Sequence, residues 1–289
     1  MDAKAIEKGN LACPGCQLNL AFKHSLSALK NNAIVVVPAC CTSVIQGAGQ
    51  GYGMHVPIFN TAFASAPSVA SGIARKLKLD GSDTQVVVWA GDGGTADIGF
   101  ASLSGAAERN ENILYIMYDN QGYQNTGNQK SGATPAGAKT STTPYGKPNR
   151  RKDVARLMIA QEVPYVATAN AAFPEDLFDK ITRAATEFSG QFRFIQIFSP
   201  CPPGWTIDTR NTVKVGQLAN STGFWPMYEA VNGKVTLSRR SQKYIDPSKR
   251  TPVREFLEVQ GRFNETPEVI RAVEEEIEDI WTWLRKFMD

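Results

Sequence analysis

Short, continuous apolar runs alternate with longer amphipathic stretches over residues 18–198. The apolar runs, rich in Val, Ile and aromatic residues, predict buried strands, and the stretches between them show helical periodicity. The strands are expected at 33–37, 84–89, 113–118, 165–169 and 192–198, and the helices at 18–29, 62–77, 96–109, 153–161 and 174–188. Such alternation is typical of a parallel sheet covered on both faces. We therefore predict an α/β fold whose mostly parallel sheet carries helices on both faces.

The pattern changes after Trp205. Short apolar runs on either side of Asn232-Gly233 predict a small hairpin. Thr266 followed by Pro267 predicts the start of a last helix that runs to about residue 288. We place a domain boundary here, with an α/β domain over 1–205 and a C-terminal extension over 206–289. The extension is expected to be an irregular arm that makes subunit contacts.

Polar residues follow two of the predicted strands directly. Gly91-Asp92-Gly93-Gly94 comes after the strand at 84–89, and Asn120 and Gly122 come after the strand at 113–118. Parallel strands present their carboxyl ends at one sheet edge, where ligands bind. Asp92, Asn120 and the Gly122 carbonyl are oxygen ligands of the kind that Mg²⁺ prefers. A Gly-Asp-Gly tripeptide by itself is more often an ordinary turn, so the pairing of two strand ends carries the prediction.

Residues 122–150 contain mainly Gly, Ser, Thr, Pro, Asn and Lys without apolar periodicity. A segment of this length inside a compact domain is usually functional or disordered. Because it follows the predicted metal-binding strand, we expect it to fold over the site and to form part of a substrate cavity.

The chain contains five cysteines, an odd number that disfavours a disulfide framework. Cys13 and Cys16 have C-x₂-C spacing, Cys40 and Cys41 follow the first predicted strand, and Cys201 follows the last. These positions favour a metal or redox site at the same sheet edge. Four thiolates suit either Zn²⁺ or an iron–sulfur cluster, and inert buried cysteines are a further alternative.

The net charge of +3 from 289 residues is too small to indicate nucleic acid as a partner. The apolar runs are too short to span a membrane, and residues 1–8 lack the apolar core of a secretory signal. We expect neither nucleic acid nor a membrane as a partner, and a cytoplasmic location.

Several of these motifs together resemble a known family. Gly91-Asp92-Gly93, Asp97-Ile98-Gly99 and the Asn120 segment resemble the thiamine diphosphate (TPP) motif. The run 123–147 is similar to the β subunit of pyruvate:ferredoxin oxidoreductase and its 2-oxoacid relatives. The resemblance extends from Cys13 to the segment 257–263, which covers nearly the whole chain.

This resemblance implies TPP, Mg²⁺ and one [4Fe-4S] cluster as cofactors of the domain over 1–205. Asp92, Asn120 and Gly122 are expected to hold Mg²⁺, and Asn125 to contact the reacting end of the substrate. The residues expected to bind TPP are Gly91, Asp92, Gly93, Gly94, Thr95, Asn120 and Gly122.

The resemblance also implies a cluster held by Cys13, Cys16, Cys41 and Cys201. Cys40 then lies outside the ligand set, at a position where relatives commonly have glycine. The resemblance favours Cys41 as the third ligand and leaves Cys40 as the alternative.

The implied activity is oxidative decarboxylation of pyruvate with coenzyme A to acetyl-CoA and CO₂, with electrons passing through the cluster to ferredoxin. Oxalate and branched or aromatic 2-oxoacids are alternative substrates. A non-redox TPP decarboxylase and a zinc-stabilised, non-enzymatic binding subunit are the other classes considered.

The expected partners follow from the same resemblance. An α subunit would supply the glutamate that faces the aminopyrimidine of TPP, since no glutamate in this chain has an obvious position for it. γ and ferredoxin-like δ subunits, or fused equivalents, would carry electrons to ferredoxin.

Overall fold

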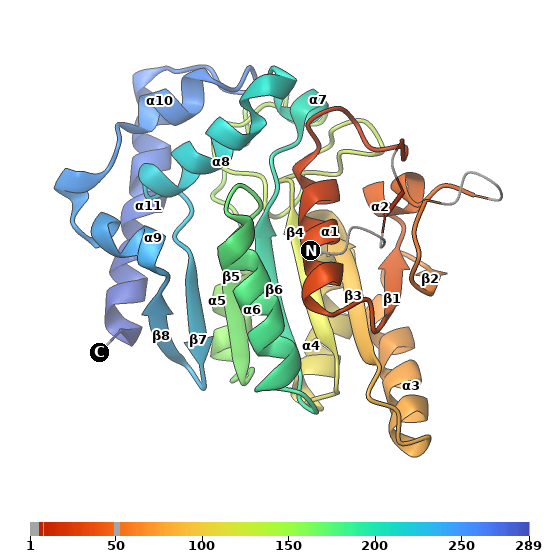
Figure 1. Ribbon diagram of the computed structural model, residues 1–289. Helices are drawn as coiled ribbons and strands as arrows, with labels where there is room; N and C mark the ends of the chain where they lie inside the picture. The colour runs from red at the N-terminus through yellow and green to blue at the C-terminus, as the bar shows by residue number, and fades with distance from the viewer. Residues whose placement is uncertain (1–5, 8, 49–52, 289) are drawn as a thin grey trace.

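The computed structural model describes residues 6–7, 9–48 and 53–288. Within this part of the chain, eight strands form one sheet in the order β2-β1-β3-β4-β6-β5-β7-β8 (Figure 1). The first six strands are parallel to their neighbours, and β7 and β8 are antiparallel. The strands are β1 (Ala33–Pro38), β2 (Ile58–Thr61), β3 (Gln85–Gly91), β4 (Leu114–Asp119), β5 (Tyr165–Asn170), β6 (Arg193–Phe198), β7 (Tyr228–Val231) and β8 (Lys234–Leu237).

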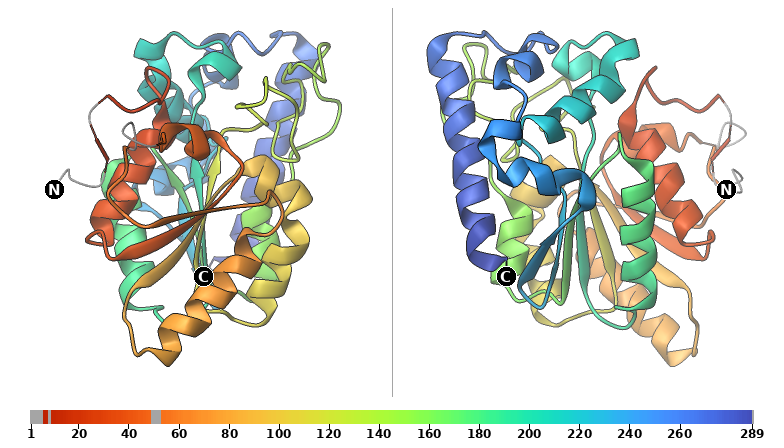
Figure 2. Two further views of the ribbon diagram at one scale, coloured as in Figure 1. Left: turned by 90° about the vertical axis from the view of Figure 1, so that its right-hand side faces the viewer. Right: turned by 60° about the vertical axis from the view of Figure 1, so that its left-hand side comes forward.

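Helices cover both faces of this sheet, as predicted. α1 and α6 lie on one face, and α3, α4, α5 and α11 lie on the other (Figure 2). The helices are α1 (Gln17–Ala28), α2 (Cys41–Ile45), α3 (Ala66–Leu79), α4 (Phe100–Glu108), α5 (Val154–Ala160), α6 (Pro174–Thr186), α7 (Pro202–Trp205), α8 (Thr212–Ser221), α9 (Arg239–Gln242), α10 (Val253–Glu258) and α11 (Pro267–Phe287). The mostly parallel α/β fold is therefore confirmed.

The central strands are apolar throughout because each supplies both layers of the core. In β3, Val86 and Val88 pack into the layer under α3 and α4, whereas Val87 and Trp89 pack into the layer under α1. Successive side chains of a strand point to opposite faces. A strand whose two faces are both buried therefore has apolar residues at every position, without alternating polar ones. This explains why the sequence shows continuous apolar runs.

The carboxyl ends of β1, β3, β4 and β6 meet at one edge, which is at the top in Figure 1. The chain leaves these four strands into α2, the turn at residues 91–94, the long segment 120–152 and α7. Segments far apart in the sequence are thus placed side by side by strand order alone.

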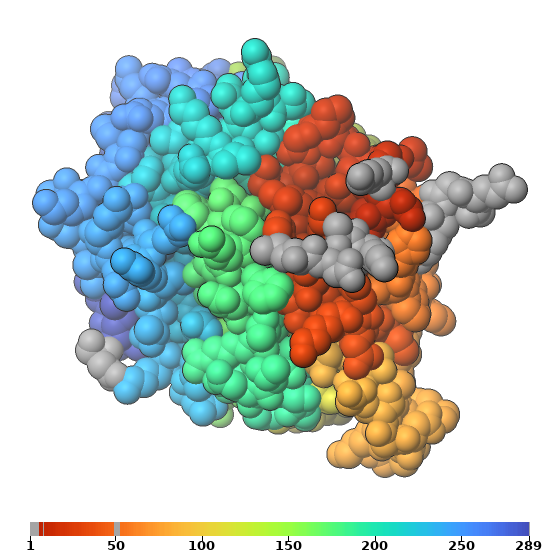
Figure 3. Space-filling view, in the orientation of Figure 1, coloured from red at the N-terminus to blue at the C-terminus, as the bar shows by residue number. Residues whose placement is uncertain are grey.

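The C-terminal region packs onto the same core. The predicted hairpin at Asn232-Gly233 is present as β7 and β8, which extend the sheet next to β5. α11 begins at Pro267, and the Thr266 hydroxyl accepts a hydrogen bond from the Val269 N–H (3.4 Å). In the space-filling view the blue C-terminal region lies against the green segment that contains α6 (Figure 3). The boundary at Trp205 and the subunit contacts stay predictions.

None of the helices found in the described ranges is both long enough and apolar enough to cross a membrane.

A buried ion pair fastens α11 to the segment that enters α5. Arg151 Nε lies 2.6 Å from Glu276 Oε1, and the two side chains are 7% and 5% exposed. The Arg151 guanidinium also lies over the Phe224 ring, 4.3 Å from its centroid, and donates to the Phe224 carbonyl. Charges at this depth are tolerated only as a pair.

Replacing Glu276 by leucine would leave the Arg151 guanidinium buried without its counter-charge. We expect the free energy of unfolding, measured in urea, to fall by about 3–5 kcal/mol, and the double variant with Arg151→Met to recover most of it. On the same helix, Glu275 pairs with Arg150 in solvent. The control Glu275→Leu should lower stability by less than about 1 kcal/mol. Equal losses for the two glutamate variants would contradict the role given to the buried pair.

Candidate functional site

Asp92 and Asn120, predicted from separate strand ends, are in direct contact. Asp92 follows β3, and its side chain is fully buried. Its Oδ1 accepts a hydrogen bond from the Asn120 N–H (3.2 Å), and its Oδ2 accepts one from the Ser131 hydroxyl (2.5 Å). Burial, followed by the nearby Asp119 carboxylate, raises the pKa of Asp92 well above its ordinary value. The carboxylate is thus fixed in place at a buried position that disfavours its charged form.

The side-chain amide of Asn120 brings a third oxygen to the same point. One of its terminal atoms lies 2.8 Å from Asp92 Oδ1 and 3.0 Å from the Gly122 carbonyl oxygen. As NH₂ this atom would donate to both neighbours; as oxygen it completes a group of three acceptors that only a cation can hold together. Oxygens bound to Mg²⁺ at about 2.0–2.1 Å in an octahedron lie about 2.9 Å apart. The spacings from the Asn120 side chain to Asp92 and to the Gly122 carbonyl therefore fit Mg²⁺.

The backbone turn after Asn120 explains this convergence. Gln121 has a φ of +58°, in the left-handed region. A left-handed residue reverses the chain sharply, so the Gly122 carbonyl returns towards the Asn120 side chain. Thr134 donates from its hydroxyl to the Gln121 carbonyl (2.7 Å) and holds the turn in place.

A cavity of about 90 Å³ is bordered by Asn120 and Gly122 but not by Asp92, and Gly91, Gly93, Gly94 and Asn125 also line it. Glycines let a ligand reach the backbone without meeting a side chain. The chain runs from Gly93 into a π-helical turn (Gly94–Ile98) and on into α4, so a helical start faces this edge. A helix start of this kind suits phosphate groups.

Thr95 does not border the cavity. Its hydroxyl donates to the Gly91 carbonyl (2.7 Å) and lies 3.0 Å from the Tyr115 hydroxyl, in the interior. The side chain therefore stabilises the turn, and the contact of Thr95 with the cofactor stays a prediction.

Tyr123 borders the same cavity and packs against the glycine turn. Its hydroxyl lies 3.1 Å from the Gly93 carbonyl and 3.0 Å from Asp97 Oδ2, and the same Asp97 oxygen accepts the Gly132 N–H (2.9 Å). A Cβ added at Gly93 would lie only 2.5 Å from the Tyr123 ring. The sequence indicates Gly93 but gives no sign that a tyrosine requires it.

The long polar segment 122–150 is ordered by hydrogen bonds rather than by apolar packing. Lys147 is buried, and its ammonium group donates to the carbonyls of Gly132 (3.2 Å), Thr134 (2.6 Å) and Arg150 (3.3 Å). Burial lowers the pKa of Lys147 to about 8. This network explains how the segment folds without the periodicity of a helix or strand.

Four cysteines border a second cavity, of about 210 Å³. They are Cys13 and Cys16 from the turn before α1, Cys41 from the start of α2, and Cys201 from the turn before α7. Cys40 borders the glycine-lined cavity instead. Burial raises the pKa of Cys201 to about 12 and raises those of Cys16 and Cys41 as well, so these thiols are protonated unless a metal binds.

As placed, these cysteines do not meet at a single point. Across the described residues, no three side chains of His, Cys, Asp or Glu are grouped closely enough to hold one metal ion. The four thiols share a cavity rather than a tetrahedral centre. A cluster binds each thiolate through a different iron atom, so its ligands need to surround a volume.

The two cavities share a wall. Cys41, Asn120, Gln124 and Asn125 border both of them. Asn120 Nδ2 lies 3.9 Å from Cys41 Sγ, and Gln124 donates from its side chain to the Asn120 carbonyl (2.9 Å). The oxygen site and the cysteine site are therefore separated by about one side chain.

Two further contributors, Trp205 and Arg262, were missed by sequence reasoning. The Trp205 indole donates to the Asn120 carbonyl (2.8 Å), and the Arg262 guanidinium lies over the indole, 3.6 Å from its centroid. Their position after Cys201 and in the C-terminal region gave no sign of this contact, which depends on tertiary packing.

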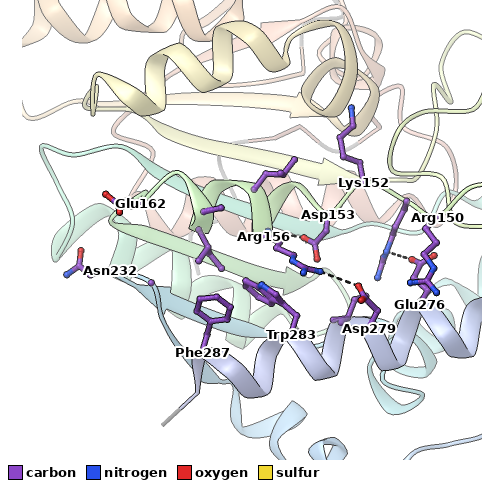
Figure 4. Close-up of a pocket in the computed structure, with 16 residues that line it drawn as sticks. Arg150, Lys152, Asp153, Arg156, Glu162, Asn232, Glu276, Asp279, Trp283 and Phe287 are labelled. Carbon is purple, nitrogen blue, oxygen red and sulfur yellow. Dashed lines mark hydrogen bonds and ion pairs between the residues drawn. The ribbon is translucent and has the colours of Figure 1, made fainter.

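A larger cavity of about 1000 Å³ lies between α5 and α11 and is bordered by none of the predicted site residues (Figure 4). Two ion pairs, Arg156–Asp279 (3.2 Å) and Arg151–Glu276 (2.6 Å), lie on its wall.

Comparisons with known proteins identify the family to which the chain belongs. Residues 41–197 match the family described as thiamine pyrophosphate enzyme, C-terminal TPP binding domain. The ketoisovalerate oxidoreductase subunit VorB of Pyrococcus horikoshii is 40% identical over 293 residues, with 97% of this chain and 92% of the relative covered. The pyruvate synthase subunit PorB of Methanothermobacter thermautotrophicus is 40% identical over 284 residues, with 96% of each chain covered.

Among solved structures, the 2-oxoglutarate:ferredoxin oxidoreductase from Magnetococcus marinus is similar with a TM-score of 0.59. The match has 20% sequence identity and covers 96% of this chain and 89% of that chain. At this identity the likeness shows the fold alone, and it agrees with the parallel sheet described above.

The close approach of Tyr123 makes a specific prediction for Gly93. In Gly93→Ala the new methyl group would displace the tyrosine from its contacts with Gly93 and Asp97, and we expect the free energy of unfolding to fall by about 1–3 kcal/mol. Gly72, within α3, has open space around its Cβ position. The control Gly72→Ala should be neutral or stabilising by up to about 1 kcal/mol. If both variants unfold at the same urea concentration, the tyrosine contact does not require glycine.

Proposed function

Because the chain belongs to the family of β subunits of 2-oxoacid:ferredoxin oxidoreductases, which are TPP-dependent, we propose that it carries the cofactor-binding half of such an enzyme. With its partner subunits it decarboxylates a 2-oxoacid oxidatively and passes the electrons through a [4Fe-4S] cluster to ferredoxin. The observation that carries this proposal is the shared wall between the oxygen site and the four-cysteine cavity.

Mg²⁺ and the diphosphate of TPP bind at the glycine-lined cavity. Asp92, Asn120 and the Gly122 carbonyl hold the cation, which the 2.8 and 3.0 Å spacing of their oxygens supports. Bound TPP supplies the electron sink that decarboxylation of a 2-oxoacid requires.

The glycine backbone contacts the diphosphate. Gly91, Gly93 and Gly94 leave their N–H groups accessible to it, and Thr95 contributes its backbone N–H. Asn125, exposed and bordering both cavities, orients the reacting end of the substrate.

Cys13, Cys16, Cys41 and Cys201 hold the [4Fe-4S] cluster. All four face one cavity, whereas Cys40 faces the cofactor side, which supports Cys41 as the third ligand. The cluster accepts single electrons. Its position behind the wall formed by Asn120 and Cys41 places it next to the reacting centre.

The proposed assembly lies in the cytoplasm. An α subunit completes the TPP site and supplies the glutamate that faces the aminopyrimidine, since none of the described residues that line the cavity is a glutamate. γ and ferredoxin-like δ subunits, or fused equivalents, then carry the electrons to ferredoxin. Relatives named as subunits of pyruvate synthase and ketoisovalerate oxidoreductase support a complex of several chains.

Pyruvate, with coenzyme A as acyl acceptor and acetyl-CoA and CO₂ as products, is the first candidate substrate. Ketoisovalerate, a branched 2-oxoacid, is the second, because a relative named for it is as similar as the one named for pyruvate synthase. Oxalate and aromatic 2-oxoacids complete the set to be tested.

Protein purified without oxygen should be brown and contain about four iron atoms, with broad absorbance near roughly 400 nm from sulfur-to-iron charge transfer. Cys201→Ser should lose most of this iron, whereas Cys40→Ser should retain it, because Cys201 borders the four-cysteine cavity and Cys40 does not. A colourless protein with stoichiometric zinc would remove the redox proposal in favour of the zinc-stabilised subunit. Iron lost from Cys40→Ser and kept in Cys41→Ser would move the third ligand to Cys40.

The assembled complex should reduce ferredoxin with pyruvate or ketoisovalerate in the presence of coenzyme A. Replacing Asp92 by asparagine removes the charge that binds Mg²⁺, so we expect at least a tenfold weaker Mg²⁺-dependent binding of TPP, about 1.4 kcal/mol. The exposed Asp208→Asn is the matched control and should bind TPP normally. Activity with oxalate alone would replace the pyruvate assignment, and unchanged TPP binding in Asp92→Asn would contradict the metal site.

A further inference from the structure

Arg262 is a buried cation whose hydrogen-bond acceptors are uncharged. It lies between α10 and α11 and is 4% exposed. Its guanidinium donates to Gln121 Oε1 (2.6 Å) and Gln260 Oε1 (3.0 Å). Within residues 6–7, 9–48 and 53–288 it forms no ion pair with a carboxylate, unlike Arg151.

A buried guanidinium without a counter-charge is unfavourable by several kcal/mol unless another negative group offsets it. Burial lowers the pKa of Arg262 well below its ordinary value, and Asp119, Cys201 and Asp92 act in the opposite direction. The negative groups that favour the charged form of Arg262 are thus the strand-end carboxylates and one of the four cysteines.

Trp205 connects Arg262 to both sites. The guanidinium lies 3.6 Å from the indole centroid, and the indole donates to the Asn120 carbonyl (2.8 Å). Through its backbone N–H, Trp205 also donates to the Cys201 carbonyl (2.9 Å), closing the turn that carries this cysteine. The cation therefore lies against a ring whose residue contacts both the Asn120 turn and the Cys201 turn.

We propose that Arg262 is the fixed counter-charge of the cluster at the four-cysteine cavity and raises its reduction potential. The inference rests on the proposed function and adds a residue from the C-terminal region to it. A cluster held by four thiolates is anionic and becomes more so on reduction, so a nearby buried cation stabilises the reduced form. Because the cation is buried, salt screens it only weakly.

The test is a redox titration of the complete complex, followed by the electron paramagnetic resonance signal of this cluster. Arg262→Gln and Arg262→Met are neutral variants of different shape, and Arg262→Lys keeps the charge. We expect each neutral variant to shift the reduction equilibrium at least tenfold towards the oxidised form, which is 59 mV for one electron. Arg262→Lys should stay within a threefold change. Arg254→Met, an exposed arginine on α10, is the control and should not shift.

The outcomes separate this inference from the proposed function. A wild-type complex without any iron–sulfur signal would overturn both. A normal cluster whose potential is the same in wild type, Arg262→Gln and Arg262→Met would overturn the role of Arg262 alone, even if the variants were less stable to heat. Loss of the cluster from both folded neutral variants, with retention in Arg262→Lys, would support the proposal, because the charge would then be needed to hold the anionic cluster.

Discussion

The arrangement at this sheet edge depends on one buried carboxylate. Asp92 is fully buried and fixed by the Asn120 N–H and the Ser131 hydroxyl, and one terminal atom of the Asn120 side chain lies 2.8 Å from its Oδ1. A buried carboxylate is unfavourable as an anion unless a cation lies nearby. Strand order brings these groups together, because β3 and β4 are neighbours whose carboxyl ends lie at the same edge. A divalent cation bound there would offset the unfavourable burial of the carboxylate.

The polar segment after β4 and the C-terminal region both serve this edge. Ser131 comes from the long segment, which the buried Lys147 ammonium organises through three carbonyls. Trp205 and Arg262 hold the Asn120 turn from the other side. The C-terminal region therefore contributes to this sheet edge. Its packing explains how Arg262 contacts residues near Asn120, more than a hundred positions earlier in the sequence.

Much of the fold could be predicted because local patterns determine it. The apolar runs of β1, β3, β4, β5 and β6 and the alternation with helices are visible in the sequence, and Asp92 and Asn120 are indicated by their place after strands. β2, α2, α8 and α10 were missed, since they are short or lack a clear period and are stabilised by tertiary packing. Tyr123, Trp205 and Arg262 could not be assigned because their roles come from contacts between distant segments.

The central claim is that the oxygen site and the cysteine site adjoin each other through Asn120 and Cys41. Mn²⁺ accepts the same oxygen ligands as Mg²⁺ and is paramagnetic. The decisive measurement is therefore the electron paramagnetic resonance spectrum of the reduced cluster in the complete complex, with TPP and either Mn²⁺ or Mg²⁺ bound. We expect the cluster signal to broaden and relax faster with Mn²⁺ than with Mg²⁺. Identical cluster signals with both metals, each bound stoichiometrically, would show that the two sites do not share a wall.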